Sequence, residues 1–308
     1  MSQPDFLNHF TKTYHKAPYD AISPDLPALS YSGKTVLITG AGTGVGFSTA
    51  TAFAQAHASN LILLGRREAK LQEAKAKLEA DSTGVKVHIF AVSINDAAAL
   101  AKVFDEIKKT IGQIDIVVQS AINAQRPYAL DAVPEAFLTE TFNSVMLGSL
   151  NILKLFHASD ERDPAREKVF VNISSCAAHC NTPGLIPYGS LKAAMAVFLQ
   201  HYQTQFADTG LRIHSLHPGA TYTEGVENYG TPKDIIPWDD GRLPGQFILW
   251  LASPEAAFLA GRFVWANWDV TEMVSRKAEF EADPELLKIG LMTGKHELYP
   301  VQAPPKAD

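Results

Sequence analysis

A tyrosine and a lysine four positions apart, Tyr188 and Lys192, are the residues of this sequence best suited to move a proton. On a helix, residues spaced i and i+4 lie on one face, so the phenol and the amine would be neighbours. A free phenol has a pKa of about 10, and a nearby ammonium group lowers that pKa by stabilising the phenolate. Ser175, thirteen residues before Tyr188, adds a hydroxyl that could hold a carbonyl group. We therefore expect these three residues to perform acid–base chemistry on a ketone or an alcohol.

A glycine-rich segment lies much earlier in the chain, where Thr39 to Gly46 read Thr-Gly-Ala-Gly-Thr-Gly-Val-Gly. It joins an apolar run to an alanine-rich stretch, which is where a strand would turn sharply into a helix. Glycine allows the tight turn, lets the backbone approach a ligand and lets the helix pack closely on the sheet. The helix start then offers unpaired N–H groups and its positive dipole end to phosphates. The segment predicts a site for a dinucleotide pyrophosphate, with a plain strand-to-helix turn as the alternative.

The end of the second apolar run indicates which nicotinamide dinucleotide would bind. An acidic residue there would accept a hydrogen bond from the ribose 2′-hydroxyl of NAD. Gly65 stands at that place, and Arg66 and Arg67 follow it. Because guanidinium groups match the geometry of a phosphate, the sequence favours NADP(H), with NAD(H) less favoured. The two arginines could alternatively only solvate the start of a helix.

The elements that would position these groups alternate regularly along the chain. The expected strands cover 35–39, 61–64, 85–92, 114–118, 169–173 and 211–216, and the expected helices cover 45–56, 68–80, 97–110, 135–157 and 188–206. Apolar strands separated by helices pair in parallel, with both faces of the sheet covered. With right-handed crossovers, this order predicts an α/β fold with a doubly wound, Rossmann-type, mostly parallel sheet and helices on both faces.

The alternation defines a single dinucleotide-binding catalytic domain over residues 34–270. Residues 1–33 are polar and interrupted by prolines, which predicts an N-terminal extension draped over the domain, and residues 271–308 form a C-terminal extension. Residues 220–245 break the rhythm with glycines and prolines among Tyr222, Tyr229 and Trp238. A long irregular segment at the ligand-binding edge predicts a lid over an apolar small molecule, with a packed surface excursion as the alternative.

Composition excludes several classes of partner. The 308 residues are 46% hydrophobic and 19% charged, with a net charge of −6 and no long basic run, so neither nucleic acid nor an anionic membrane is expected. No apolar run reaches the ~18 residues of a membrane helix, and the first residues lack the pattern of a secretory signal. We expect a cytoplasmic protein that acts on a small molecule.

The cysteines and histidines indicate neither disulfides nor a metal. Cys176 and Cys180 are the two cysteines of the chain, so no disulfide framework can form. With His179 they could suggest zinc, but the second ligand pair of a structural zinc site is lacking. No metal is therefore expected, and the remaining histidines considered are interpreted as structural or surface groups: His57, His157, His201 and His217.

Together, these motifs resemble those of the short-chain dehydrogenase/reductase family, from about Gly33 to Asp269. The glycine segment resembles the family's cofactor turn, Asn172-Ile173-Ser174-Ser175 its serine-bearing strand, and Tyr188-x-x-x-Lys192 its active-site pair. His217-Pro218-Gly219-Ala220-Thr221-Tyr222-Thr223 resembles the Pro-Gly segment that contacts the nicotinamide. The flanking residues 19–24 and 261–270 are similar to those of fungal members often found in secondary metabolism.

The resemblance implies roles for individual residues. Lys192 would also bind the nicotinamide ribose, and Thr223 would lie in the carboxamide-binding position. With the two arginines, the expected cofactor-binding residues are Gly40, Thr43, Gly44, Val45, Gly46, Arg66, Arg67, Ser93, Ala121, Tyr188, Lys192, Pro218, Gly219, Thr221 and Thr223. The resemblance also suggests a homodimer or homotetramer, with helices 135–157 and 188–206 at the interface.

Three departures from the family pattern stand out. Gln119-Ser120-Ala121-Ile122 replaces the usual Asn-Asn-Ala-Gly, and Ser93 replaces an adenine-contacting Asp. Val145, three residues before Gly148, replaces the Asn that anchors a proton-relay water. Asn143 lies two positions earlier, roughly 200° around a helix, so it is a poor substitute. The departures predict weaker cofactor binding or a different route for the proton.

The sequence thus favours an NADP(H)-dependent oxidoreductase that interconverts a ketone and a secondary alcohol. One alternative is a scaffold repurposed for a non-redox step, namely isomerisation, cyclisation or dehydration, which the three departures motivate. Another is a non-enzymatic protein that senses a dinucleotide. The joint retention of Ser175, Tyr188 and Lys192 speaks against this last reading.

Overall fold

Seven parallel strands form one sheet in the order β3-β2-β1-β4-β5-β6-β7. The computed structural model describes residues 10–82, 84–122, 132–158, 167–180, 184–228 and 230–291. The strands are β1 (Thr35–Thr39), β2 (Asn60–Gly65), β3 (Lys86–Ala91), β4 (Ile116–Gln119), β5 (Lys168–Ile173), β6 (Leu211–His217) and β7 (Phe263–Trp265). The inner strands are buried along their whole length, which explains their continuous apolar runs. The predicted doubly wound parallel sheet is confirmed.

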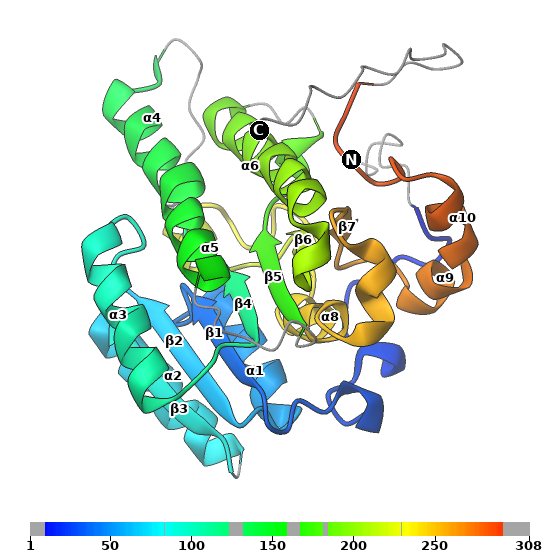
Figure 1. The fold of residues 1–308 in the computed structure, drawn as a ribbon. Coiled ribbons are helices and arrows are strands. Elements are labelled where there is room, and N and C mark those ends of the chain that lie inside the picture. Colours follow the sequence, from blue (N-terminus) through cyan, green and yellow to red (C-terminus); the bar gives the residue numbers. More distant parts are fainter. Residues whose placement is uncertain are drawn as a thin grey trace, which may run out of the picture.

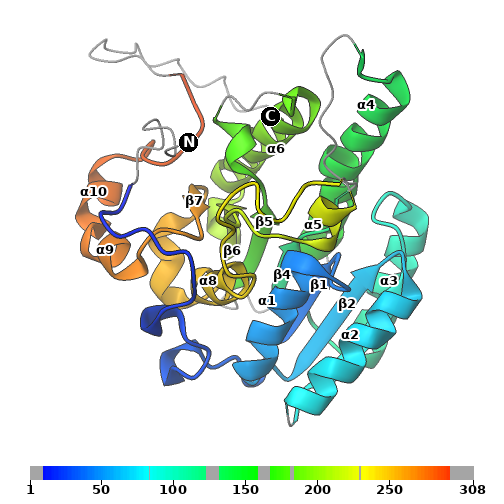
Figure 2. The same cartoon turned by 180° about the vertical axis from the view of Figure 1, so that it is seen from behind.

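Helices cover both faces of this sheet. One face carries α3 (Ala97–Thr110), α4 (Glu135–Phe142), α5 (Gly148–Ala158) and α6 (Ile186–Gln205), as Figure 1 shows. The other face carries α1 (Gly44–Gln55), α2 (Glu68–Asp81) and α8 (Leu243–Leu251), which lie in front in Figure 2. Three further α-helices are short: α7 (Glu224–Glu227), α9 (Val270–Ser275) and α10 (Lys277–Ala282).

The core consists of two hydrophobic clusters, one under each helical layer. Phe53 of α1 and Phe247 and Trp250 of α8 are fully buried in the first cluster. Phe156 of α5 and Phe170 of β5 are fully buried in the second. Burying a large apolar side chain contributes about 1.5–3 kcal/mol, so these two layers hold the sheet edge on which the site is built.

The last crossover departs from the expected right-handed pattern. From β5 to β7 the chain moves across the sheet in one direction, but α6 covers one face and α8 the other. Two successive crossovers over opposite faces must have opposite hands, and the connection from β6 through α8 to β7 is the left-handed one. Such connections are right-handed in about 98% of cases, so this one is an exception. Here the long segment from residue 218 to 242 lets α8 pack beside α1 instead.

Described residues before β1 and after β7 pack against each other beside β7. Tyr14 forms an isolated antiparallel bridge with Trp268, and the amide of His15 donates to the Asn267 carbonyl at 2.7 Å. Ile22 is fully buried before the first strand, and Met273 and Phe280 are buried after the last. Tight packing therefore extends beyond the proposed domain limits of residues 34 and 270.

Several elements had no clear signal in the sequence. β7 is only three residues long, and α8 reads Leu-Pro-Gly-Gln-Phe-Ile-Leu-Trp-Leu, with apolar residues on nearly every side. Neither shows the periodicity that marks a half-buried element. Within the described part of the chain, no helix combines the length and the apolar character needed to cross a membrane.

Candidate active site

The carboxyl ends of four adjacent strands carry most of the candidate residues. β1 ends at Thr39, β4 at Gln119, β5 at Ile173 and β6 at His217, and these strands are neighbours in the sheet. Ligands of open α/β sheets bind in the crevice outside the carboxyl ends of the strands. The topology therefore gathers at one edge groups that lie up to 180 residues apart in sequence.

Close backbone contacts shape the glycine-rich turn after β1. Gly40 and Gly44 have positive φ angles of 65° and 57°, a region that glycine adopts without steric cost. A Cβ atom added at Gly40 would lie 2.9 Å from the Cα of Ala121, and one added at Gly46 would lie 2.4 Å from the Gly40 carbonyl oxygen. No other residue type fits either place without displacing the backbone.

This turn is suited to hold phosphates. α1 begins at Gly44, and its N-cap Thr43 makes no side-chain capping bond. The amides of Gly44, Val45 and Gly46 lie in the first turn, where amides have no acceptor within the helix. Such amides, at the positive end of the helix dipole, favour a pyrophosphate. The residues present therefore fit a dinucleotide.

The altered segment after β4 is held by a network around Thr39. The Thr39 hydroxyl donates to Oε1 of Gln119 at 2.7 Å and accepts the amides of Ser120 at 3.0 Å and Ala121 at 2.9 Å. Nε2 of Gln119 also donates to the Ala121 carbonyl at 3.2 Å. Gln119 therefore fixes Ala121 beside Gly40, and this departure from the family pattern preserves the local structure.

The two arginines after β2 have different surroundings. Arg66 is exposed, whereas Arg67 forms an ion pair with Glu224 of α7. Nη2 of Arg67 also lies 3.5 Å from Oγ1 of Thr43. Ser93 follows β3, where its hydroxyl accepts the amide of residue 95 at 3.3 Å. Adenine contact by Ser93 stays a prediction.

Lys192 and Tyr188 lie together near the start of α6. Both are buried, and Nζ of Lys192 is 5.7 Å from the centroid of the Tyr188 ring. Nζ of Lys192 donates to the Ile173 carbonyl at 2.5 Å, which ties α6 to the end of β5. Burial lowers the pKa of Lys192 to about 7. Its charge at neutral pH therefore depends on any negative charge that forms beside it.

Ser175 lies two residues beyond the carbonyl that Lys192 binds. Its hydroxyl accepts the amide of Ala177 at 3.2 Å and caps the short helix η5 (Cys176–Ala178). A Cβ atom at Gly189 would lie 2.5 Å from the Ala177 carbonyl oxygen, so η5 and α6 are in direct contact. The sequence-predicted catalytic residues thus lie on adjoining elements.

A buried carboxylate, Asp239, fixes the Pro-Gly turn after β6. Its Oδ2 accepts the amide of Ala220 at 2.7 Å and Nδ2 of Asn267 at 2.9 Å. Gly219, with a φ angle of 84°, leaves room for this oxygen, since a Cβ there would lie 2.7 Å from it. Sequence reasoning missed Asp239 and Asn267, because no spacing links them to the Pro218-Gly219 pair.

The segment after this turn crosses to the cofactor turn. Thr221 pairs with Asp239 in an isolated parallel bridge, and Thr223 caps α7 by accepting the amide of Val226 at 3.4 Å. A Cβ at Gly44 would lie 3.3 Å from Cγ2 of Thr223. Tyr222 and Trp238 form an edge-to-face pair at 5.3 Å. Tyr229 lies outside the described residues, and the function of the segment as a lid stays a proposal.

Two histidines beside Ser175 have defined tautomers. Nδ1 of His217 is 3.1 Å from the Cys176 amide, which can only donate, so this nitrogen accepts. Trp265 donates its indole N–H to Nε2 of His179 at 3.1 Å. Burial, followed by the nearby His179, lowers the pKa of His217 to about 3. His217 is therefore a neutral group that holds η5 at the end of β6.

The proton-relay position is apolar. Val145 is buried in the second hydrophobic cluster, and Asn143 lies at the start of a π-helical turn, η4 (Asn143–Leu147). The amide of Gly148 donates to the Asn143 carbonyl across this turn. Such wide turns often occur at functional sites. No cluster of three or more His, Cys, Asp or Glu side chains that could hold a metal occurs among the residues described.

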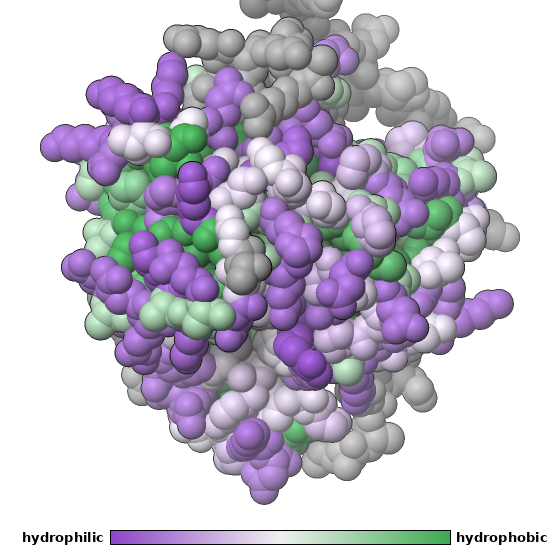
Figure 3. Space-filling view, turned by 90° about the horizontal axis from the view of Figure 1, so that it is seen from below, coloured by the Kyte–Doolittle hydropathy of each residue, from purple (hydrophilic) through white to green (hydrophobic). Residues whose placement is uncertain are grey.

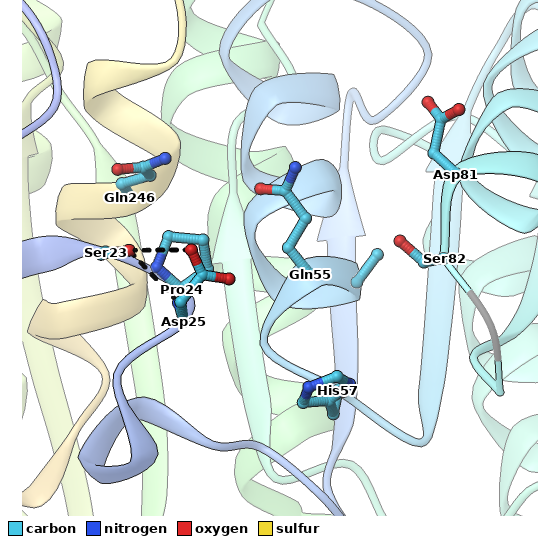
Figure 4. Close-up of a pocket in the computed structure, with 9 residues that line it drawn as sticks. Ser23, Pro24, Asp25, Gln55, His57, Asp81, Ser82 and Gln246 are labelled. Atoms are coloured by element: carbon cyan, nitrogen blue, oxygen red, sulfur yellow. Dashed lines mark hydrogen bonds between the residues drawn. The ribbon is translucent and has the colours of Figure 1, made fainter.

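A polar cavity of about 360 Å³ lies away from this edge. Figure 4 shows residues at the C-terminal ends of α1 and α2 around it, including Gln55, His57 and Asp81, with Asp25 and Gln246 opposite. Because helices run antiparallel to the strands, this is the amino end of the sheet. Seen from below, mostly hydrophilic side chains cover the molecule, with hydrophobic ones in separate patches (Figure 3). The cavity cannot serve the residues at the carboxyl ends.

The doubly wound sheet and the glycine turn at its carboxyl edge define an α/β fold suited to bind a dinucleotide. Residues 34–234 match the sequence profile of the family described as short chain dehydrogenase. The chain is 38% identical over 286 residues to "Short chain dehydrogenase/reductase nsrO" of Aspergillus novofumigatus, covering 92% of this chain and 96% of that relative. The protein therefore belongs to the short-chain dehydrogenase/reductase family.

Two further similarities agree with this assignment. The chain is 36% identical over 284 residues to a short chain dehydrogenase/reductase of Claviceps purpurea, with coverage of 92% and 94%. Among solved structures, it resembles a 3-ketoacyl-(acyl-carrier-protein) reductase from Brucella melitensis complexed with NADH. That likeness has a TM-score of 0.70 at 22% identity and covers 77% of this chain and 97% of the other. It supports the fold alone.

Proposed function

We propose that this protein is an NADP(H)-dependent oxidoreductase that interconverts a ketone and a secondary alcohol on an apolar small molecule. The observation that carries the proposal is the buried pair on α6, with Nζ of Lys192 at 5.7 Å from the Tyr188 ring and bonded to the Ile173 carbonyl at 2.5 Å. A buried phenol beside a buried amine, at the edge that fits a dinucleotide, suits proton transfer to a carbonyl oxygen.

Each catalytic residue has a separate task. Tyr188 gives its proton to the oxygen of the ketone and takes it back in the reverse direction. Lys192, in its ammonium form, stabilises the phenolate that remains, and that negative charge in turn favours the ammonium form over the neutral amine that burial favours. The hydroxyl of Ser175 orients the carbonyl. Bound NADP(H) would supply or accept the hydride, and the protein would supply orientation and charge.

The preference for NADP(H) rests on the residues after β2. The strand ends at Gly65, so no carboxylate from this position would repel a 2′-phosphate. Arg66 is exposed, and no hydrogen bond or ion pair joins it to a residue that the structure describes. An unengaged guanidinium group at this place is a suitable phosphate ligand. NAD(H) is the less favoured cofactor.

Further features support proposals about the substrate, the cellular setting and the oligomeric state. Tyr222 and Trp238 supply an aromatic pair in residues 220–245, which supports an apolar substrate under a lid. We also propose a cytoplasmic enzyme of fungal secondary metabolism, in line with its relatives from Aspergillus and Claviceps. A homodimer or homotetramer is supported by exposed apolar side chains on the helices 135–157, namely Leu138, Phe142 and Leu147.

The test begins with a titration of the purified protein with NADPH and NADH, followed by energy transfer from tryptophan. We expect NADPH to bind more tightly than NADH. An Arg66→Gln variant should lose that preference while it still binds NADH. A panel of aromatic and aliphatic ketones then tests for stoichiometric consumption of NADPH. Product without consumption would favour the non-redox alternative, and binding of neither cofactor would remove the proposal.

A further inference from the structure

Thr223 and Glu224, in the segment between β6 and α8, contact the cofactor turn. A Cβ at Gly44 would lie 3.3 Å from Cγ2 of Thr223, so Thr223 packs on the first residue of α1. Glu224 forms an ion pair with Arg67, whose Nη2 lies 3.3 Å from the carboxylate Oε2. The same Nη2 is 3.5 Å from Oγ1 of Thr43. Three distant parts of the sequence thus meet at one turn.

This arrangement separates the tasks of the two arginines. Arg67 already faces a carboxylate, whereas Arg66 has no partner in the described part of the chain. The hydrogen bond from Arg67 lowers the pKa of Glu224, so its carboxylate stays ionised at neutral pH. A phosphate placed at Arg67 would meet that negative charge, which opposes binding. Arg67 is therefore suited to hold Glu224 rather than the 2′-phosphate.

We propose that Glu224 is a positioning residue that retains the cofactor through its ion pair with Arg67, beside the dinucleotide turn at residues 43–46. The inference rests on the proposed binding of a nicotinamide dinucleotide there. A pyrophosphate on the N-terminus of α1 would lie at residues 43–46. Arg67 contacts the first of these residues, Thr43, and Thr223 lies against the second, Gly44. The ion pair opposes movement of residues 221–228 away from the turn, so it slows the release of NADPH and NADH alike.

The expected effect is moderate because the pair is partly exposed. The side chains of Arg67 and Glu224 are 56% and 32% exposed, so water and salt screen their attraction. Exposed ion pairs of this kind change an equilibrium by about two- to fivefold. High salt should reduce the effect further, since the Debye length falls from about 10 Å at 0.1 M to about 3 Å at 1 M ionic strength.

The test measures cofactor release by stopped-flow fluorescence in four variants: Arg67→Gln, Glu224→Gln, the double variant, and the exchange of the two charges in Arg67→Glu/Glu224→Arg. We expect each single variant to release both cofactors about two- to fivefold faster. The double variant should be no faster than either single variant, because the same contact is lost. The charge exchange should restore part of the slow release.

Arg242→Gln is the matched control. Arg242 also pairs with a carboxylate, Asp240, but that partner belongs to the same segment, so the pair cannot link the segment to the turn. Release rates should stay unchanged in this variant. Hydrogen exchange of residues 221–228 gives a second readout that requires no cofactor. It should rise in Arg67→Gln and Glu224→Gln but not in Arg66→Gln.

Three results would overturn the inference. Additive effects of the two single variants would show that the contact does not act as a unit. Tighter binding of NADPH alone in Glu224→Gln would show that Arg67 is a phosphate ligand which Glu224 restrains. Unchanged hydrogen exchange of residues 221–228 in Arg67→Gln and Glu224→Gln would show that the ion pair does not hold this segment. This result would count even if neither cofactor bound. Failure of the proposed function has another signature, namely an unmodified protein that binds neither NADPH nor NADH.

Discussion

The carboxyl edge has two halves, a cofactor half at the turn after β1 and a substrate half at the ends of β5 and β6. Different kinds of interaction stabilise them. At the turn after β1, backbone atoms pack so closely that a Cβ at Gly46 would lie 2.4 Å from the Gly40 oxygen. At the ends of β5 and β6, hydrogen bonds from buried polar side chains join the neighbouring elements. Lys192 bonds to the Ile173 carbonyl, and His217 accepts the Cys176 amide at 3.1 Å.

This difference teaches where each half is vulnerable. The cofactor half depends on the absence of side chains, so one added methyl group should damage it while changes of pH should not. The substrate half depends on buried groups that titrate, and their neutral forms are favoured only because burial disfavours charge. It should therefore respond to pH and to the loss of single polar atoms.

The largest expected effect is that of Tyr188→Phe, which removes the proton donor and leaves the cofactor half intact. Turnover should fall by about 10²- to 10⁴-fold, the usual contribution of a positioned acid or base. Affinity for NADPH should stay within about threefold, because the phenol is not needed at the glycine turn. Steady-state kinetics and fluorescence titration measure the two quantities.

Tyr202→Phe is the matched control for this variant. Tyr202 lies on the same helix, near its far end, and its hydroxyl pairs with His157 rather than with the site. Its turnover should equal that of the unmodified protein. If Tyr188→Phe instead lost cofactor affinity in step with turnover, the separation of the two halves would be wrong.

The next effect concerns Gly46→Ala, which tests the close packing of the cofactor half. The new Cβ would have to displace the Gly40 carbonyl from 2.4 Å, so the turn must open. Overpacking of this kind costs about 1–3 kcal/mol of stability, and cofactor affinity should fall at least about tenfold. The control is Gly241→Ala, where an added Cβ meets nothing within 4 Å. A Gly46→Ala variant with normal affinity would contradict the steric account.

The cofactor half could be predicted from the sequence because its constraints are local. The turn residues Gly40, Gly44 and Gly46 lie within seven positions, and each is required by a contact or a φ angle inside that stretch. The strand before them, β1, is buried at every position, so it shows in the sequence as a continuous apolar run. For the same reason Tyr188 and Lys192 could be paired, since one helix turn separates them.

The substrate half could not be predicted to the same depth, because its partners lie far apart in the sequence. Asp239 joins residues 220 and 267. His217 was interpreted as structural, but its partner is the amide directly after Ser175. Such pairs carry no spacing signal, and only the folded sheet edge brings them together.

The last expected effect is an acid sensitivity that comes from two histidines of β6, His214 inside the strand and His217 at its carboxyl end. Burial, the largest cause, lowers the pKa of both His214 and His217 to about 3. In the unfolded chain, a histidine has a pKa of about 6.5. Below pH 6.5 the unfolded state therefore binds protons that the folded state does not, and stability falls as the pH falls.

Urea unfolding between pH 7.5 and 5 should show this loss as a slope that reaches about 1.4 kcal/mol per pH unit for each histidine. Asparagine at either position keeps a polar atom near Nδ1 but cannot titrate. His214→Asn, which keeps a donor toward the Leu259 carbonyl, and His217→Asn, which keeps an acceptor for the Cys176 amide, should each lower the slope. His88 and His179, whose pKa values burial also lowers, should keep the remainder. In the window above pH 5, most carboxylates stay ionised, so their titration contributes little. A slope that stays unchanged in the double variant would mean that the folded state accepts protons at these two sites, and the electrostatic description of both histidines would fail.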